Sequence, residues 1–204
     1  MNTKKLSLVL LLGFTLTFAG CSIIKSFVNL SRLQFKLHGV TSISVAGVPL
    51  TGKKAISDLN VFEIAKVTES FFKGSLPLTF TLDLAAVNPN TGSGGYARTD
   101  AQLKSLPFRF VVDSKELITG NIKNPVSIPG TGETEHLPID LSIDLVKVIK
   151  DQGYESLLNL ALKIGGVGSG SSNVQLLAKP VVSTVLGDIA YPDEIKIVDA
   201  TFSK

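Results

Sequence analysis

Few residues in this 204-residue chain have the type and spacing that catalysis or metal binding requires. The chain has two histidines, and His136 lies close to Glu133 and Glu135. One imidazole and two carboxylates could hold a divalent metal ion, but three ligands from one short loop make a weak site. The favoured interpretation is therefore a solvated loop. His38 alternates with the apolar residues of a short strand pattern and is expected at the surface.

Two glycine-rich segments match phosphate-binding loops only in part. Residues 47–53 have the G-x-x-x-x-G-K spacing. However, Lys54 stands where Ser or Thr would bind Mg²⁺, and Pro49 lacks an N–H that such a loop uses. A hairpin turn is expected there instead. Residues 166–171 lack the third glycine of G-x-G-x-x-G, because position 171 is Ser, so a turn is expected there too.

The sequence does not predict a nucleophilic site or a carboxylate pair. It contains no G-x-S-x-G elbow. Asp140 and Asp144 share one face of a predicted strand, ~13 Å apart, which is too far for a catalytic pair. We therefore expect no enzyme, no cofactor and no metal ion. The formal charge of +3 is too small to indicate a nucleic-acid partner.

The strongest chemical signal is Cys21, the only cysteine in the chain. Lys4 and Lys5 precede an apolar run over 6–18, which is too short to span a bilayer and is typical of a secretory signal. The run ends in Phe18-Ala19-Gly20-Cys21, which resembles a bacterial lipobox. Residues 1–20 are thus expected to be a lipoprotein signal peptide, and Cys21 to carry diacylglycerol with acyl chains such as palmitate. The alternative is an ordinary signal peptide, cut nearby, that leaves a free thiol.

A lipid on Cys21 has consequences for location. Residues 21–30 form a tether that spans at most ~35 Å when extended. Loss of Lys4 and Lys5 lowers the formal charge from +3 to about +1, so acyl chains rather than charge must hold the protein at the membrane. Ser22 stands where Asp would signal inner-membrane retention. By resemblance to Gram-negative lipoproteins, this favours the outer membrane, with the protein facing the periplasm.

Residues 31–204 have the composition of a single folded domain. Apolar residues make up 44% of the chain and charged residues 18%, which excludes intrinsic disorder as its main state. In residues 137–145, aliphatic side chains occupy every second position. This period of two predicts a strand with one face on a core. Similar runs at 33–37, 43–45, 78–84, 106–112, 117–118, 174–176 and 195–197 predict a mainly β fold, an antiparallel β-sandwich.

Two short helices are predicted between the strands. Asn60 and Glu63 form a capping pair before a run that ends at Phe72, with Gly74 after it. Its apolar face is expected to comprise Val61, Ile64, Ala65, Thr68, Phe71 and Phe72. The second helix covers about 154–164, with an apolar stripe of Leu157, Leu158, Ala161 and Ile164. Each helix is expected to cover an open edge or end of the sandwich.

An ordered series of segments resembles a known family. A strand over 82–87 runs directly into Asn88-Pro89, and the segments 106–113, 126–130 and 137–145 follow. The series, over about 76–179, resembles the type 2 late-embryogenesis-abundant (LEA) family, whose unit is the water-stress-and-hypersensitive-response (WHy) domain. This resemblance implies a fibronectin- or immunoglobulin-like sandwich, a stress role and no catalytic residues. The insert 91–105 departs from the family pattern and is expected to be a variable loop.

The sequence thus favours a membrane-anchored lipoprotein that protects against stress such as desiccation. A folded domain would do so through a surface that contacts envelope proteins or lipids. The alternative is an envelope adaptor module that binds one protein partner or an apolar ligand, because a fold does not dictate function.

Overall fold

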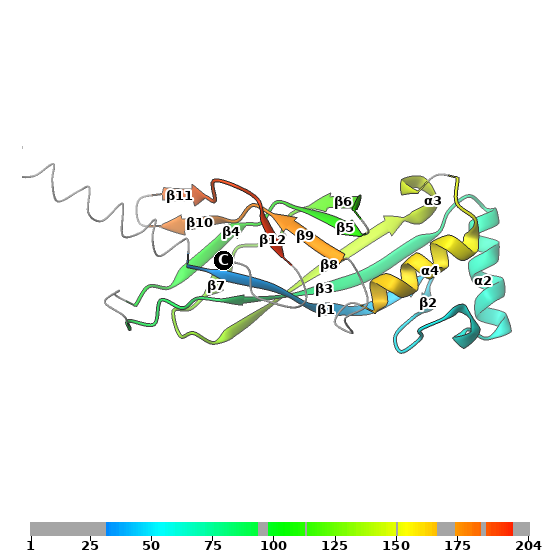
Figure 1. The fold of residues 1–204 in the computed structure, drawn as a ribbon, viewed down its shortest axis with the longest axis horizontal. Helices are drawn as coiled ribbons and strands as arrows, with labels where there is room; N and C mark the ends of the chain where they lie inside the picture. The colour runs from blue at the N-terminus through cyan, green and yellow to red at the C-terminus, as the bar shows by residue number, and fades with distance from the viewer. Residues whose placement is uncertain are drawn as a thin grey trace, which may run out of the picture.

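A computed structural model describes residues 32–93, 98–112, 114–149, 151–166, 174–184 and 187–197. The expected signal peptide, the tether and Cys21 lie outside these residues, as does most of the glycine-rich segment at 166–171. The described chain is mainly β and elongated, and its strands pack in two layers (Figure 1). The expected antiparallel β-sandwich is confirmed.

One layer is an antiparallel sheet in the order β2-β1-β3-β8, formed by Val48–Pro49, Gln34–Val45, Pro77–Val87 and Thr134–Asp144. The β3–β8 ladder pairs every residue from Pro77 opposite Asp144 to Val87 opposite Thr134. Alternate residues of both strands face the core, as their sequence period predicts. The predicted strand end is wrong by one residue, because Leu145 is buried as the first residue of a helix.

Two shorter antiparallel sheets form the other layer. The first has the order β11-β10-β4-β7, formed by Gly187–Ala190, Val181–Thr184, Ala101–Ser105 and Val126–Ile128. The second has the order β12-β9-β5-β6, formed by Ile195–Ile197, Val174–Ala178, Phe108–Val112 and Lys115–Gly120. Pro107 separates β4 from β5, and Pro180 separates β9 from β10. Because proline has no N–H to donate, the strand ladder is interrupted at both places.

The insert at 91–105 is not a loop throughout, contrary to expectation. Its last five residues form β4, which pairs with β7 and β10. Leu103 is buried there, between the exposed residues Gln102 and Lys104. The alternation is too short, and too rich in polar residues, to stand out in the sequence.

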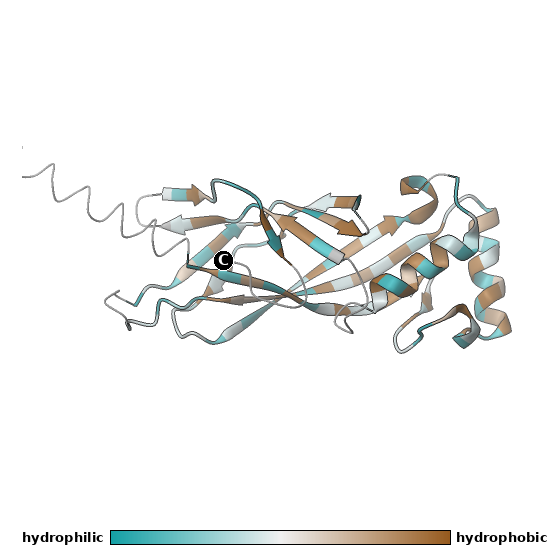
Figure 2. Cartoon of the chain, viewed as in Figure 1, coloured by the Kyte–Doolittle hydropathy of each residue, from teal (hydrophilic) through white to brown (hydrophobic). Residues whose placement is uncertain are grey.

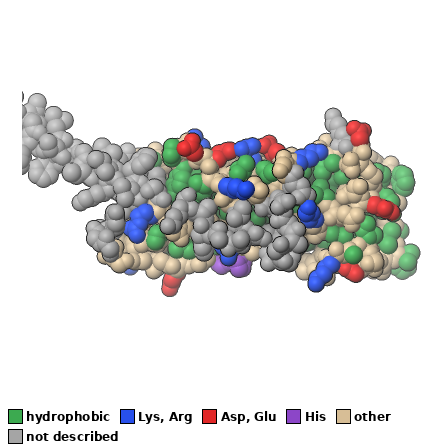
Figure 3. Space-filling view, viewed as in Figure 1, with side chains coloured by type: hydrophobic (Ala, Val, Ile, Leu, Met, Phe, Trp, Pro, Cys, Tyr) green, Lys and Arg blue, Asp and Glu red, His purple; other side chains and the backbone are tan. Residues whose placement is uncertain are grey.

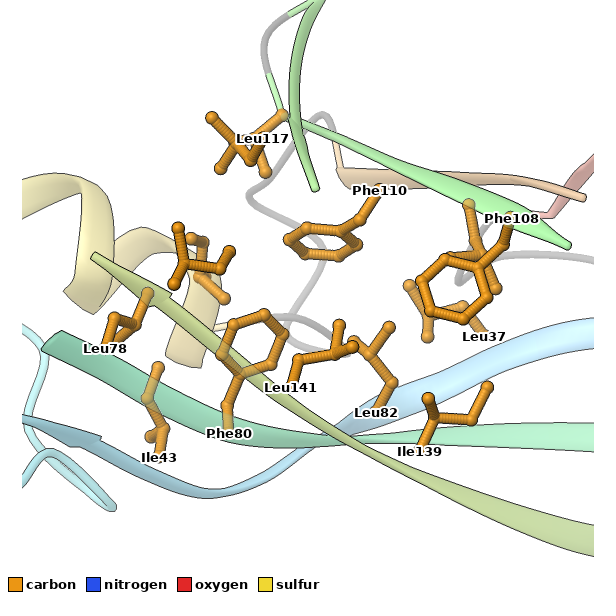
Figure 4. Close-up of a cluster of buried hydrophobic side chains, with 14 of the residues drawn as sticks. Leu37, Ile43, Leu78, Phe80, Leu82, Phe108, Phe110, Leu117, Ile139 and Leu141 are labelled. Carbon is orange, nitrogen blue, oxygen red and sulfur yellow. The ribbon is translucent and has the colours of Figure 1, made fainter. Parts of the chain in front are cut away.

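The core lies between the two layers. Phe80 of β3 and Phe110 of β5 meet across it with ring centroids 5.3 Å apart. Figure 4 shows these rings among aliphatic side chains from both layers. Leu141 of β8 is 8% exposed and points into the same cluster. The large apolar residues that alternate in the sequence therefore form the contact between layers.

The helices gather at one end of the body, where α2 and α4 lie close together (Figure 1). The described residues contain three α-helices rather than two: α2 (Val61–Phe72), α3 (Leu145–Val148) and α4 (Tyr154–Gly165). A 3-10 turn, η1 (Ile56–Asp58), precedes α2. The short α3 escapes prediction because Leu145 continues the strand's period of two. The expected apolar stripe of α4 is buried.

The predicted α2 start is confirmed, because Asn60 and Glu63 form a reciprocal capping box. Its predicted buried face is right for Ile64 and Phe71 and wrong for Val61, Ala65 and Phe72. Val67 is buried, and Ile64 and Phe71 pack on the core as partly buried residues. Val61 and Phe72 are instead 80% and 79% exposed. The helix has two neighbouring apolar stripes. The sandwich covers the stripe with Ile64, Val67 and Phe71 and leaves the stripe with Val61 and Phe72 exposed.

Candidate functional site

The Asn88-Pro89 segment lies where β3 leaves its sheet, since β3 ends at Val87. The Asn88 side chain is fully buried. Its amide nitrogen donates to the carbonyl oxygens of Thr99, at 2.8 Å, and Ile128, at 2.9 Å. Its side-chain oxygen accepts from the backbone and side-chain nitrogens of Asn90. Asn88 thus uses both donors and both acceptor positions of its amide.

Asn90 continues this polar cluster. Its side-chain oxygen accepts a hydrogen bond from Arg32 at 2.9 Å, and its carbonyl oxygen accepts from the Thr99 N–H at 3.0 Å. Gly130 lies against the same carbonyls: a Cβ at this position would be 2.6 Å from the Asn90 oxygen. Only glycine permits that approach without a shift of the backbone. The cluster joins the end of β3 to β7 and to the segment before β4.

The two histidines meet on the outer face of the β1-β3-β8 sheet. The rings of His38 and His136 have centroids 5.1 Å apart. Nδ1 of His136 is 2.9 Å from both carboxylate oxygens of Asp83. A hollow of about 250 Å³ lies beside His136, lined by residues 121–124, 126 and 136–140. In the described residues, no group of three His, Cys, Asp or Glu side chains is placed to hold a metal ion.

The two strand aspartates have separate partners. Asp140 accepts from the Thr81 hydroxyl at 2.8 Å. Asp144 accepts from the Ser75 hydroxyl and the Leu76 N–H at 2.8 and 3.0 Å. Burial raises the pKa of Asp144, but these hydrogen bonds and Lys147 outweigh it and hold the pKa below its usual value. Both carboxylates therefore connect neighbouring segments and do not face one another.

The segment that resembles a phosphate loop begins as a hairpin turn, as expected. Ala46 and Gly47 join β1 to β2 with φ of 49° and 72°, the signs of a type I′ turn. Lys53 forms an ion pair at 2.9 Å with Glu63 in the first turn of α2. A hollow of about 540 Å³ nearby is lined by Gly52, Lys53, Lys54, Asn159, Leu162, Lys163, Gly165 and Gly166. The sequence patterns did not reveal this lysine-lined hollow, because it combines two segments about 110 residues apart.

Sequence reasoning also missed the exposed apolar side of α2. Val61, Phe62 and Phe72 are the large apolar residues that stand out as exposed in the described chain. Figure 2 shows the hydrophobic residues along this helix. The helical period reveals the apolar stripes, but it does not say which one the sandwich covers.

No family model and no curated protein matches this chain. Two solved structures show low similarity. One is a protein from Archaeoglobus fulgidus, with 10% identity and a TM-score of 0.31 over 60% of this chain and 85% of that chain. The other is the solution structure of a candidate late embryogenesis abundant (LEA) protein, with 14% identity and a TM-score of 0.38 over 96% and 85%. Among the described residues, no helix combines the length and apolar character needed to cross a bilayer.

Proposed function

We propose that this chain is a non-enzymatic lipoprotein of the bacterial cell envelope, held in the outer membrane through Cys21 and facing the periplasm. The observation that carries this proposal is the position of the only cysteine, directly after Phe18-Ala19-Gly20 and a short apolar leader. Each acyl CH₂ buried in the bilayer contributes ~0.8 kcal/mol, and two acyl chains together anchor a protein stably.

The folded body is proposed to protect envelope proteins or lipids during desiccation by contact with them. The support is the resemblance of the segments around Asn88-Pro89 to the type 2 LEA family. A body with a packed apolar core cannot replace water in the way that a disordered, highly charged chain can. Protection by this protein therefore requires a surface. The described carboxylates of Asp83, Asp140 and Asp144 are engaged in contacts within the fold.

The anchor is tested by metabolic labelling with a fatty-acid analogue. Cys21→Ala is expected to abolish labelling and to leave the signal peptide uncut, because the thiol is the site of lipid attachment. Ser22→Ala is the matched control and is expected to be labelled and sorted like the wild type. Labelling of Cys21→Ala would contradict the anchor.

The protective role is tested by drying. Cells that lack the protein are expected to recover less well from drying than cells that produce it, and Cys21→Ala is expected to rescue them only in part. Equal recovery would contradict this role. The alternative is an envelope adaptor that binds one protein partner or an apolar ligand. In that case, crosslinking in intact cells would yield one dominant protein partner.

A further inference from the structure

One helix of the body exposes large apolar side chains to solvent. Val61, Phe62 and Phe72 on α2 are 80%, 87% and 79% exposed. At three quarters or more of a typical side-chain area, they present on the order of 400–500 Å² of apolar surface. A patch of this size on a soluble body marks an interaction site more often than chance.

The exposed apolar residues fall on one side of the helix. At 100° per residue, Val61, Ala65 and Phe72 lie within about 40° of each other around the helix axis, and Phe62 widens the face to about 100°, with Glu69 between Ala65 and Phe62. Ala65 is exposed as well. The adjacent side of α2, with Ile64, Val67 and Phe71, is centred about 110° from this face and packs on the sandwich. The apolar face therefore lies beside the contact with the body and stays exposed, and Figure 3 shows hydrophobic side chains gathered at this end.

Lysines border this apolar face. Lys66 and Lys73 lie on one flank, next to Phe62 in the helical projection. Glu69 lies on the other side of Phe62 and forms an ion pair with Lys73 at 2.5 Å, whereas the Lys66 ammonium donates a hydrogen bond to the Gly47 carbonyl at 3.3 Å. Near the first turn of α2, Lys53, Lys54 and Lys163 line the 540 Å³ hollow, and Lys53 is also paired with Glu63 at 2.9 Å.

We infer that this face of α2 docks on an anionic phospholipid surface, with the Phe rings entering the interfacial region and the lysines meeting lipid phosphates. Apolar aromatic residues flanked by lysines are the features of helices that lie in a membrane interface. A second copy of the chain is a less favoured partner for this face than a lipid surface. Stable protein interfaces bury about 800 Å² on each partner, well above what the α2 face offers.

This contact, if combined with the proposed lipid on Cys21, gives the protein two attachment points. α2 lies at the end of the body opposite to the start of β1 (Figure 1). The 12 residues of β1 extend for ~40 Å, and the tether reaches ~35 Å. Both ends can therefore reach one leaflet, with the body lying along it. This consequence rests on the proposed anchor, whereas the lipid contact of α2 does not.

The test uses the mature chain from residue 21 with Cys21→Ser, so that acylation cannot contribute. Its core is built from Leu33 to Ile197, which this chain retains. The protein is expected to sediment with vesicles of phosphatidylglycerol and phosphatidylcholine. Phe62→Ser with Phe72→Ser is expected to reduce the bound fraction at least tenfold, and its unfolding transition, measured in parallel, is expected to stay near that of the parent because both side chains are exposed.

Two charge-reversal variants test whether the lysines of α2 contribute to binding. Lys66→Glu with Lys73→Glu is expected to weaken binding at least fivefold. Lys115→Glu with Lys123→Glu changes the net charge equally at exposed sites outside α2 and is expected to bind like the parent. Three results would each overturn the inference: no sedimentation with these vesicles, equal binding by the Phe variant, or self-association of the parent that the Phe variant abolishes. None of these results depends on whether Cys21 is lipidated in cells.

Discussion

The side-chain oxygen of Asn88 accepts hydrogen bonds from both nitrogens of Asn90, the residue two positions ahead, at 3.2 Å from the backbone and 2.8 Å from the side chain. This local ring leaves the Asn88 amide nitrogen free to point away from its own segment. It donates to two carbonyls that lie 11 and 40 residues further along the chain. A short loop thereby fixes the relative position of the two layers at the end opposite to α2.

Asn88→Ala is expected to lower the free energy of unfolding by ~2–4 kcal/mol. The substitution removes the two hydrogen bonds that Asn88 donates to the carbonyls of Thr99 and Ile128 and the two that it accepts from Asn90, and a buried group left unsatisfied costs ~1–3 kcal/mol. Urea denaturation measures the change. The control Asn124→Ala removes an exposed amide and is expected to change stability by less than ~0.5 kcal/mol. Equal stability of the two variants would show that Asn88 does not hold the layers together.

Gly130→Ala is expected to destabilise the same cluster from the other side. Its methyl group would lie 2.6 Å from the Asn90 carbonyl oxygen and 2.8 Å from that of Thr99. Both contacts are with backbone, which cannot rotate away, so we expect a loss of ~2 kcal/mol or more. Gly153→Ala meets nothing within 4 Å, and its φ of −69° suits any residue. A thermal midpoint that falls for Gly153→Ala as much as for Gly130→Ala would contradict the close approach.

The sequence reveals local features of this fold and misses those that depend on distant segments. The alternation in β8 predicts its buried face, and the spacing of Asn60 and Glu63 predicts the start of α2, because each signal lies within a few residues. The partners of Asn88 carry no such signal. Thr99 and Ile128 contribute only backbone oxygens, which every residue has.

The exposed face of α2 illustrates a second limit. Periodicity places Val61 and Phe72 together, and the general rule that apolar residues lie inside predicts that they are buried. They are exposed because α2 packs on the end of the sandwich through the side that contains Val67, which is fully buried. The sequence therefore predicts that α2 has apolar residues on one side, but it does not predict that Val61 and Phe72 are exposed to solvent.

Leu141→Asp is expected to lower the free energy of unfolding by at least ~3 kcal/mol, because it places a carboxylate in the cluster around Phe80 and Phe110. Ser142→Asp introduces the same side chain at the next position of β8, which is exposed, and is expected to cost less than ~1 kcal/mol. Circular dichroism during thermal unfolding compares the two. If both variants unfolded at the wild-type temperature, the assignment of the inner face of β8 would be wrong.

Asp144 is expected to make the stability of the protein depend on pH in the acidic range. Burial raises the pKa of its carboxyl, but hydrogen bonds from the Leu76 N–H and the Ser75 hydroxyl, together with Lys147, outweigh burial and lower it. Because the pKa is lower in the folded state than the unfolded value of about 3.9, the stabilisation is complete well above that value. It is lost as pH falls through the folded pKa.

The variant that tests this dependence is Asp144→Asn, which keeps an acceptor oxygen but removes the charge. At pH 7 it is expected to be less stable by ~1–2 kcal/mol, since hydrogen bonds to a charged group are the stronger ones. Its deficit relative to the wild type is expected to shrink as pH falls from 5 to 2, because the wild type then loses the same charge. Urea denaturation at several pH values measures both effects, with Asn124→Ala expected to follow the wild-type profile. A deficit that stays constant over this range would show that the Asp144 charge does not contribute to the junction between β3 and β8.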